Sequence, residues 1–169
     1  MATLMGLDLY DVKVENRDFQ GKKFGPQYRT FAVTMNDSEL IETLGKCGVE
    51  FWHTTPRNDD PPRTKMNVRV DNRYGDVQIV LVDADGTPIK LNPDNPGDAK
   101  FIDGAWMEKA AMHIDVVQYT NPRTGAPIVT PMLKSLIAHI LPQEEVEKIR
   151  ANGATRTDPI REKFAQYFD

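Results

Sequence analysis

Aromatic and basic residues alternate in a glycine-containing stretch close to the N-terminus, residues 17–29. Its cations and rings are Arg17, Phe19, Lys22, Lys23, Phe24, Tyr28 and Arg29. This combination suits an unpaired nucleic-acid strand, because cations follow the phosphates while flat rings stack on exposed bases, each stack contributing about 1–3 kcal/mol. The alternative for Phe19 and Phe24 is that they pack beneath the loop as ordinary core, since most aromatic side chains are buried.

A second set of candidate residues follows from the alternation of side chains along strands. Residues 65–71 alternate, so Lys65 and Arg69 point outward when the apolar residues between them face the core. In the same way, Trp52 points outward if Phe51 points inward. A tryptophan beside a lysine and an arginine on the solvent face of a sheet is a platform for bases. The alternative for Trp52 is burial beneath a loop or in a dimer interface.

Motifs for other chemistry are incomplete. Gly45-Lys46 lacks the upstream glycine and the following Ser or Thr of a phosphate-binding loop, and residues 83–86 lack the ligands of a calcium loop. The three histidines do not have metal-ligand spacing. Cys47, at the end of an apolar helix, is expected to be an inert thiol. We therefore expect no enzymatic activity, no bound metal and no cofactor.

Composition bounds the class of protein. The chain has 169 residues, of which 40% are hydrophobic and 27% are charged, as in ordinary globular domains. Its single cysteine excludes an internal disulfide, and no apolar run reaches the roughly 18 residues of a membrane span, so we expect a soluble, cytoplasmic protein with no membrane contact. The net charge of −4 argues against nucleic-acid binding over the whole surface, but local patches decide binding. Cations gather in residues 13–29 and acids in residues 76–115.

The elements expected to position these residues are short strands separated by turns that contain Gly and Pro. Strands are predicted over residues 7–14, 28–35, 49–53, 65–71, 76–82, 88–91, 114–119 and 128–140, and helices over residues 36–48, 105–112 and 143–150. This pattern favours an all-β fold, either a closed barrel or a small sandwich, over a βαβ nucleotide-binding fold. We expect one domain over residues 1–141, followed by a C-terminal helix and a flexible tail over residues 142–169.

A resemblance to a known family rests on a frame of short motifs. The frame begins with Asn16-Arg17-Asp18-Phe19-Gln20-Gly21 and Phe24, continues through residues 28–35, and reaches a short helix that ends at Gly48. It resembles the bacteriophage single-stranded DNA-binding proteins with an OB fold, in which an Arg-x-Phe-x-Gly loop leads into a basic-x-Phe strand. Here Arg17, Phe19, Gly21, Arg29 and Phe31 stand at the corresponding positions. The later strands, through residues 133–137, extend the resemblance to residues 12–140.

The resemblance implies an OB-like five-stranded barrel with a C-terminal helix and tail. It also implies sequence-tolerant binding of single-stranded DNA (ssDNA) in phage DNA replication or recombination, without catalysis, in the bacterial host cytoplasm if the chain is phage-encoded. Two features depart from the family pattern. Pro127 and Pro131 are expected to interrupt the last strand, and Arg156, Arg161 and Lys163 dilute the acidic tail.

The expected binding groove combines the two sets of residues. Its walls are the loop over residues 17–29 and the outward face that carries Trp52, Lys65 and Arg69. Arg57 and Arg63, in a proline-rich loop, are expected to hold the edge of the bound strand, while the acidic stretch around residues 83–103 lies on the far side. The C-terminal segment is expected to recruit a replication or recombination protein or to shield the groove.

Two rival functions remain open at this stage. The first is a non-enzymatic protein-interaction module, a small phage β-barrel that binds a host factor, which the low pI and the clustered acids favour. The second is a small hydrolase that uses carboxylates. The oligomeric state, monomer or dimer, and any preference for DNA over RNA are likewise open.

Overall fold

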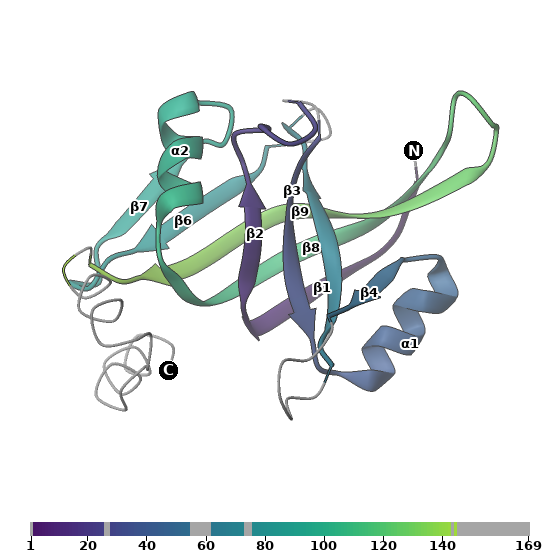
Figure 1. The fold of residues 1–169 in the computed structure, drawn as a ribbon, viewed down its shortest axis with the longest axis horizontal. Coiled ribbons are helices and arrows are strands. Elements are labelled where there is room, and N and C mark those ends of the chain that lie inside the picture. The colour runs from purple at the N-terminus through teal and green to yellow at the C-terminus, as the bar shows by residue number, and fades with distance from the viewer. Residues whose placement is uncertain (1, 26–27, 55–61, 73–75, 143, 145–169) are drawn as a thin grey trace.

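The computed structural model describes residues 2–25, 28–54, 62–72, 76–142 and 144. Within these residues the chain forms nine strands and two helices (Figure 1). Their bounds are β1 (Ala2–Val12), β2 (Val14–Asp18), β3 (Arg29–Met35), α1 (Ser38–Cys47), β4 (Phe51–His53), β5 (Thr64–Val70), β6 (Gln78–Val82), β7 (Pro88–Leu91), α2 (Pro96–Gly104), β8 (Met107–Thr120) and β9 (Pro127–Ile140). The predicted C-terminal helix over 143–150 and the tail lie outside the described residues, apart from Glu144. No helix in the described part of the chain is long and apolar enough to cross a membrane.

All nine strands belong to one mixed sheet, whose main path runs β1-β8-β9-β5-β3-β2. β4 pairs with β5, and β6 pairs with both β7 and β9. Only the β5–β9 and β6–β9 pairings are parallel. The expectation of an all-β, OB-like fold is confirmed. The sheet has nine strands rather than five, and it is open, because its terminal strands β1 and β2 follow one another in the chain without pairing.

The long β8–β9 hairpin explains this branched topology. Each strand has 14 residues, which corresponds to about 46 Å of extended chain. β5 pairs with one edge of β9 at Met132, and β6 pairs farther along β9, from Ser135 to His139. One edge of β9 therefore serves two strands in succession. In Figure 1, β8 and β9 run the length of the molecule and β2 and β3 cross in front of them.

Pro127 and Pro131 do not interrupt β9, contrary to the expectation from sequence. Both lie within β9 and pair with residues of β8, Pro127 with Thr120 and Pro131 with Val116. Proline lacks a backbone N–H and therefore weakens pairing on the side where that donor would point. The single register pair between β5 and β9, Arg69 with Met132, directly follows Pro131. Pro131 thus lies next to the shortest pairing in the sheet, which has a single register position.

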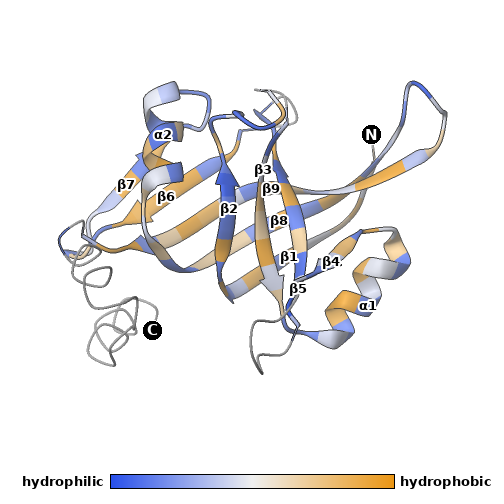
Figure 2. Cartoon of the chain, viewed as in Figure 1, coloured by the Kyte–Doolittle hydropathy of each residue, from blue (hydrophilic) through white to orange (hydrophobic). Residues whose placement is uncertain are grey.

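The core fills the inner face of the curled sheet. β3, β5, β8 and β9 each contribute alternate side chains that are almost completely shielded from solvent, among them Phe31, Val33, Met66, Val68, Ile114 and Leu136. The short strand β2 is mostly hydrophilic (Figure 2), as is typical of an edge strand with one solvated face. Alternation on β3 and β5 therefore separates a buried face from an outward face.

The first predicted helix is confirmed, and both of its ends have identifiable signals. The Asp37 side chain accepts hydrogen bonds from the backbone N–H groups of Glu39 and Leu40, which caps the N-terminus of α1. Gly48 ends the helix in the left-handed conformation, with φ of +106°. The α1 helix positions β4, which follows it in the chain.

The helix predicted over residues 105–112 is wrong. The helix lies earlier, over Pro96–Gly104, where Asn95 caps the first turn and Pro96 occupies its start. Residues from Met107 onward belong instead to β8, which pairs with β1 and β9 on its two sides. Strand pairing on both sides overrides a local pattern that suits either structure. Residues 16–18, predicted as loop, likewise belong to β2, in which Asp18 pairs with Thr30 of β3.

An ion cluster joins β1 to β8 on the outward face of the sheet. His113 Nδ1 lies 2.8 Å from Asp8 Oδ1, and its Nε2 lies 3.2 Å from Asp115 Oδ1. The hydrogen bond to Asp8 raises the pKa of His113 above 6.5; burial opposes this, and the charges of both aspartates add to it. Stability from a raised histidine pKa is fully present below about pH 6.5 and is lost as the pH rises through the folded-state pKa.

Raising the pH above 6.5 is therefore expected to lower the unfolding free energy of the protein through the loss of the His113 charge. The His113→Gln variant should show a smaller decline over the same range, measured by urea unfolding at a series of pH values. His53→Gln, at an exposed position at the end of β4, is the matched control and should decline as the wild type does. Equal declines in wild type and His113→Gln would contradict the assignment.

Two glycines near the C-terminal end of α1 offer a paired test of backbone conformation. Gly48→Ala is expected to destabilise the protein by about 1–2 kcal/mol, because an L-residue is strained in the left-handed region, and the added Cβ would lie 3.1 Å from Val129. Gly45→Ala should instead stabilise by up to about 1 kcal/mol, since it lies within the helix with nothing within 4 Å of the new Cβ. Thermal or urea unfolding measures both, and a stabilising Gly48→Ala would refute the cap.

Candidate nucleic-acid interface

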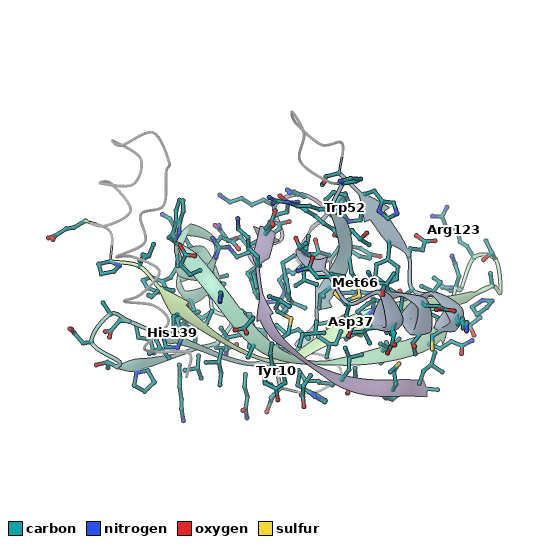
Figure 3. All side chains as sticks on the ribbon, turned by 90° about the horizontal axis from the view of Figure 1, so that it is seen from below. Tyr10, Asp37, Trp52, Met66, Arg123 and His139 are labelled. Atoms are coloured by element: carbon teal, nitrogen blue, oxygen red, sulfur yellow. The ribbon has the colours of Figure 1, made fainter. Side chains whose placement is uncertain are left out.

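The outward face of β4, β5 and β3 carries the first part of the candidate interface. Trp52, Lys65 and Thr34 are directly opposite one another on these three neighbouring strands. Phe51 packs against the core, so Trp52 lies on the opposite face, as alternation predicts. Figure 3 shows Trp52 at the outside of the molecule and Met66 directed into its interior. The strand pairings thus place a half-buried indole beside a lysine.

Lys65 is held between an aromatic ring and a carboxylate. Its Nζ lies 5.3 Å from the centre of the Trp52 ring and 2.5 Å from Glu15 Oε2. Thr34 Oγ1 donates a 3.3 Å hydrogen bond to the other carboxylate oxygen of Glu15. The Lys65 side chain is 8% exposed and that of Glu15 is 21% exposed. The register of Lys65 agrees with the sequence, but its expected exposure is wrong, because the pair with Glu15 encloses the amine.

Burial raises the pKa of Glu15, but its neighbours outweigh that effect. The hydrogen bond and the charge of Lys65, the charge of Lys13 and the hydrogen bond from Thr34 bring the net pKa of Glu15 below its usual value of 4.5. Such a carboxylate stabilises the fold above about pH 4.5 and loses that contribution as the pH falls through its folded-state pKa. At neutral pH Glu15 is therefore a fixed negative charge on this face.

A second ring and cation lie farther along β5. The Arg69 guanidinium carbon lies 5.1 Å from the centre of the Tyr28 ring, and Tyr28 itself is 51% exposed. Arg69 also lies 3.4 Å from Asp71 Oδ2 and within 3.5 Å of the Tyr119 hydroxyl. Tyr119 comes from the distal part of β8, where it pairs with Ile128 of β9. Sequence reasoning missed Tyr119, since its proximity depends on tertiary structure alone.

Lys65 and Arg69 are four positions apart on one strand, so about 13 Å of extended chain separates the two ring–cation pairs. Asn67 lies between them on the same face and is exposed. Its side-chain amide can donate and accept hydrogen bonds. The alternation that predicts outward positions for Lys65 and Arg69 also predicts one for Asn67. Its place on the candidate interface could therefore have been proposed from sequence.

The loop before β3 presents the exposed part of the interface. Asp18 accepts 2.9 Å hydrogen bonds from the backbone N–H groups of Lys22 and Lys23. Asp103 accepts from the backbone of Phe19 and from both the backbone and side-chain amide of Gln20. With the backbone held from below, the side chains of Lys22, Lys23 and Phe24 are exposed, and Phe24 is 67% exposed. Two carboxylates thus order a loop that projects cations and a ring.

Phe19 is not a stacking residue, and this correction follows directly from its burial. Its side chain is 1% exposed and stacks on Phe31, with ring centres 5.6 Å apart and an interplanar angle of 9°. A ring already covered on both faces has no surface for a base. Of the two alternatives for Phe19 and Phe24, the first residue is core and the second is exposed.

Arg17 is also directed away from the proposed groove. Its guanidinium donates a hydrogen bond to the carbonyl of Ala105, at the junction of α2 and β8. Burial lowers the pKa of Arg17, and the negative charge of Asp103 partly restores it. The residue connects β2 to α2 and is not positioned to contact phosphate.

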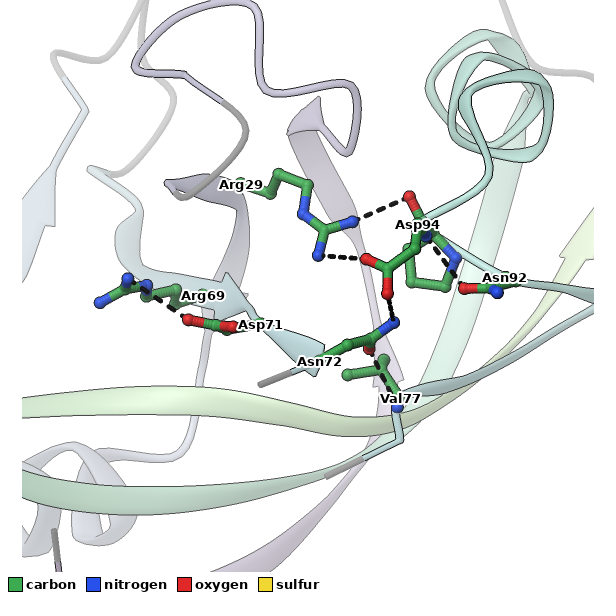
Figure 4. A network of polar contacts seen from close by, with 8 residues as sticks. Arg29, Arg69, Asp71, Asn72, Val77, Asn92 and Asp94 are labelled. Atoms are coloured by element: carbon green, nitrogen blue, oxygen red, sulfur yellow. Dashed lines mark hydrogen bonds and ion pairs between the residues drawn. The ribbon is translucent and has the colours of Figure 1, made fainter. Parts of the chain in front are cut away.

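Arg29 is buried in a polar network that joins β3 to the loop before α2 (Figure 4). Its guanidinium donates to the Pro93 carbonyl at 2.8 Å and forms a 2.8 Å ion pair with Asp94. Asp94 in turn accepts a 2.6 Å hydrogen bond from the side chain of Asn72. The expectation that Arg29 contacts phosphate is therefore wrong for this conformation, because it shares the inward parity of Phe31.

The acidic stretch over residues 83–103 does not lie wholly on the far side. Asp94 holds Arg29 and Asp103 holds the loop that carries Lys22, so both carboxylates support the candidate interface from below. The expectation that these acids lie on the far side fails because Asp94 forms an ion pair with Arg29, which brings this acid next to the strand that leads out of the loop.

The structure describes only one of the two arginines expected to hold the edge of the bound strand. Arg57 lies outside the described residues. Arg63 is exposed at the start of β5 and lines a cleft of about 860 Å³ whose other lining residues include Asp11 and Asp37. Asp8 and Lys13 also line it, so the described lining of the cleft has three acids against two cations, which makes it unfavourable for phosphate. Among the described residues, no group of three or more His, Cys, Asp and Glu side chains is arranged to hold a metal ion.

The different environments of Phe19, which is core, and Phe24, which is exposed, can be tested by measuring stability alone. Phe19→Ala is expected to lower the unfolding free energy by about 3–5 kcal/mol, because it opens a cavity next to Phe31. Phe24→Ala should change it by no more than about 0.5 kcal/mol, as at other exposed positions. Urea unfolding of both variants is the measurement, and a large loss for Phe24→Ala would show that this ring is also core.

No protein-family model matches this sequence, and no curated protein matches it. The chain is similar in fold to several solved structures, including the following three. The single-stranded DNA-binding protein of bacteriophage Enc34, in a C-terminally truncated form, is 9% identical over 80% of this chain and 86% of that chain, with a TM-score of 0.49. The Enc34 protein in complex with ssDNA is 9% identical over 79% and 85%, with a TM-score of 0.44. Bacteriophage T7 gp2.5, a single-stranded DNA-binding protein, is 15% identical over 82% and 88%, with a TM-score of 0.43.

Proposed function

We propose that this chain binds single-stranded DNA without sequence preference across the outward face of β4 and β5 and the loop before β3. The observation that carries the proposal is the repeated pairing of a ring and a cation on one face, Trp52 with Lys65 and Tyr28 with Arg69. Rings accept any base and cations accept any phosphate, so the binding they support does not depend on sequence.

Each group has a distinct role in this proposal. Trp52, Tyr28 and Phe24 stack on bases. Lys22 and Lys23, both exposed on the ordered loop, neutralise phosphates, and Arg69, which is paired with Asp71, holds the Tyr28 ring in place. The net charge of −4 does not oppose this, because the local placement of exposed cations such as Lys22 and Lys23, and not the total charge, governs what a surface attracts.

The resemblance in sequence supports a role in phage DNA replication or recombination, within the cytoplasm of the bacterial host. Binding of this kind protects or organises an unpaired strand and needs no catalytic group. Residues 142–169 are the proposed site for recruiting a replication or recombination protein. These assignments rest on the family resemblance and not on the geometry of the interface.

Fluorescence anisotropy with labelled oligo-dT tests the proposal. The two phosphate contacts proposed for Lys22 and Lys23 predict that a plot of log K against log salt has a slope of about −1.4, from −0.7 per contact on single strands. Lys22→Ala should make the slope shallower by about 0.7, whereas Lys90→Ala, an exposed lysine of β7, should leave it unchanged. Trp52→Ala should weaken binding by about 5- to 150-fold at every salt concentration, equivalent to one lost stack.

Two controls make the outcome decisive. Labelled DNA is needed because Trp52→Ala removes one of only two tryptophans, which prevents comparison by intrinsic fluorescence. Each variant should retain the wild-type unfolding midpoint within a few degrees. No anisotropy change for the wild type in low salt would overturn the proposal and favour the rival function, a non-enzymatic module that binds a host protein.

A further inference from the structure

The cations on the outward face of β5 are already paired with carboxylates of this chain. Lys65 lies 2.5 Å from Glu15, and Arg69 lies 3.4 Å from Asp71. The two carboxylates differ in their surroundings, because the Asp71 side chain is 5% exposed while that of Glu15 is 21% exposed. Only Glu15 therefore has appreciable contact with the solvent from which DNA would arrive.

Glu15 also reaches this position from another strand. It lies on β2 opposite Ala32 of β3, and its side chain extends across β3 to contact Thr34 and then Lys65 on β5. Lys65 is in turn next to the Trp52 ring. The contacts Glu15–Lys65–Trp52 thus form a continuous row across the strands, in which the carboxylate and the indole lie on either side of one amine.

We propose that Glu15 competes with DNA phosphate for Lys65 and thereby limits the affinity of this interface for single-stranded DNA. The inference rests on the proposed function. A phosphate linked to a base stacked on Trp52 would approach Lys65 and meet the negative charge of Glu15 at the same place. Binding can use the Lys65 charge only when this ion pair opens, so Glu15 acts against affinity and is a determinant of its strength.

The alternative is that Glu15 is purely structural and holds β2 onto the sheet. The two roles predict opposite effects of Glu15→Gln. Glutamine keeps an oxygen that can accept from Lys65 and an amide of similar size, while it removes the charge. Loss of a purely structural ion pair leaves DNA affinity unchanged or lowers it, whereas loss of a competitor raises it.

The test is oligo-dT binding by the full chain at salt concentrations from 50 mM to 1 M. Glu15→Gln is expected to steepen the slope of log K against log salt by about 0.7, the value for one additional phosphate contact. Between 1 M and 50 mM salt, that change in slope raises the ratio of the Glu15→Gln affinity to the wild-type affinity by roughly 8-fold. Asp85→Asn, an exposed carboxylate in the turn between β6 and β7, removes the same charge elsewhere and should leave the slope unchanged.

A double variant supplies a second, independent readout. Glu15→Gln combined with Lys65→Gln removes both charges of the pair, and its slope should match that of the wild type, because the intact pair offers phosphate no net charge. A slope shallower by about 0.7 in the double variant would show that Lys65 already contacts phosphate in the wild type, and would overturn the inference. This comparison holds even where Glu15→Gln alone does not fold.

The outcomes separate this inference from the proposed function. Wild-type binding with an unchanged or weaker Glu15→Gln variant overturns the role of Glu15 and leaves the proposed function intact. No binding by the wild type together with binding by Glu15→Gln overturns the function as proposed for the native chain, yet supports competition by Glu15. No binding by either protein overturns both.

Discussion

The burial of Met66, Val68 and Val70 sets the register of β5, and the candidate interface depends on that register. All three side chains are at most 1% exposed, and they face the core together with the alternate residues of β3. Because side chains of a strand alternate, the same burial places Lys65, Asn67 and Arg69 on the opposite face. A shift by one residue would exchange the two sets, directing two cations into the apolar core and the core side chains to the outward face.

β5 can hold this register because it is enclosed by other strands. It pairs with β3 along seven register positions and with β4 along three, and it meets β9 at Met132. Each neighbour adds one part of the outward face: β4 brings Trp52, the residue just before β3 is Tyr28, and β8 brings Tyr119. The interface is therefore a product of strand order, and the residues that compose it lie far apart in the sequence.

Carboxylates shape this surface as strongly as cations do. Asp18 and Asp103 order the loop that presents Lys22, while Asp94 holds Arg29 beneath it. Glu15 neutralises Lys65 on the outward face. In a chain with net charge −4, the acids act as structural partners for the cations that are buried and leave others, such as Lys22 and Lys23, to solvent. Local placement of charge, and not its sum, then governs which ligand the face attracts.

Much of the fold and part of the site followed from local pattern. Alternation identified β3 and β5 and the outward parity of Trp52, Lys65 and Arg69, and capping residues identified α1. Local pattern failed where neighbours decide: residues 107–112 became a strand because β1 and β9 flank them, and the two phenylalanines of one loop separated into core and surface. Parity along a strand is a property of the chain itself, since it arises from backbone geometry. Burial, ion pairing and the meeting of Glu15, Lys65 and Trp52 depend on residues distant in sequence, so only the tertiary structure could determine them.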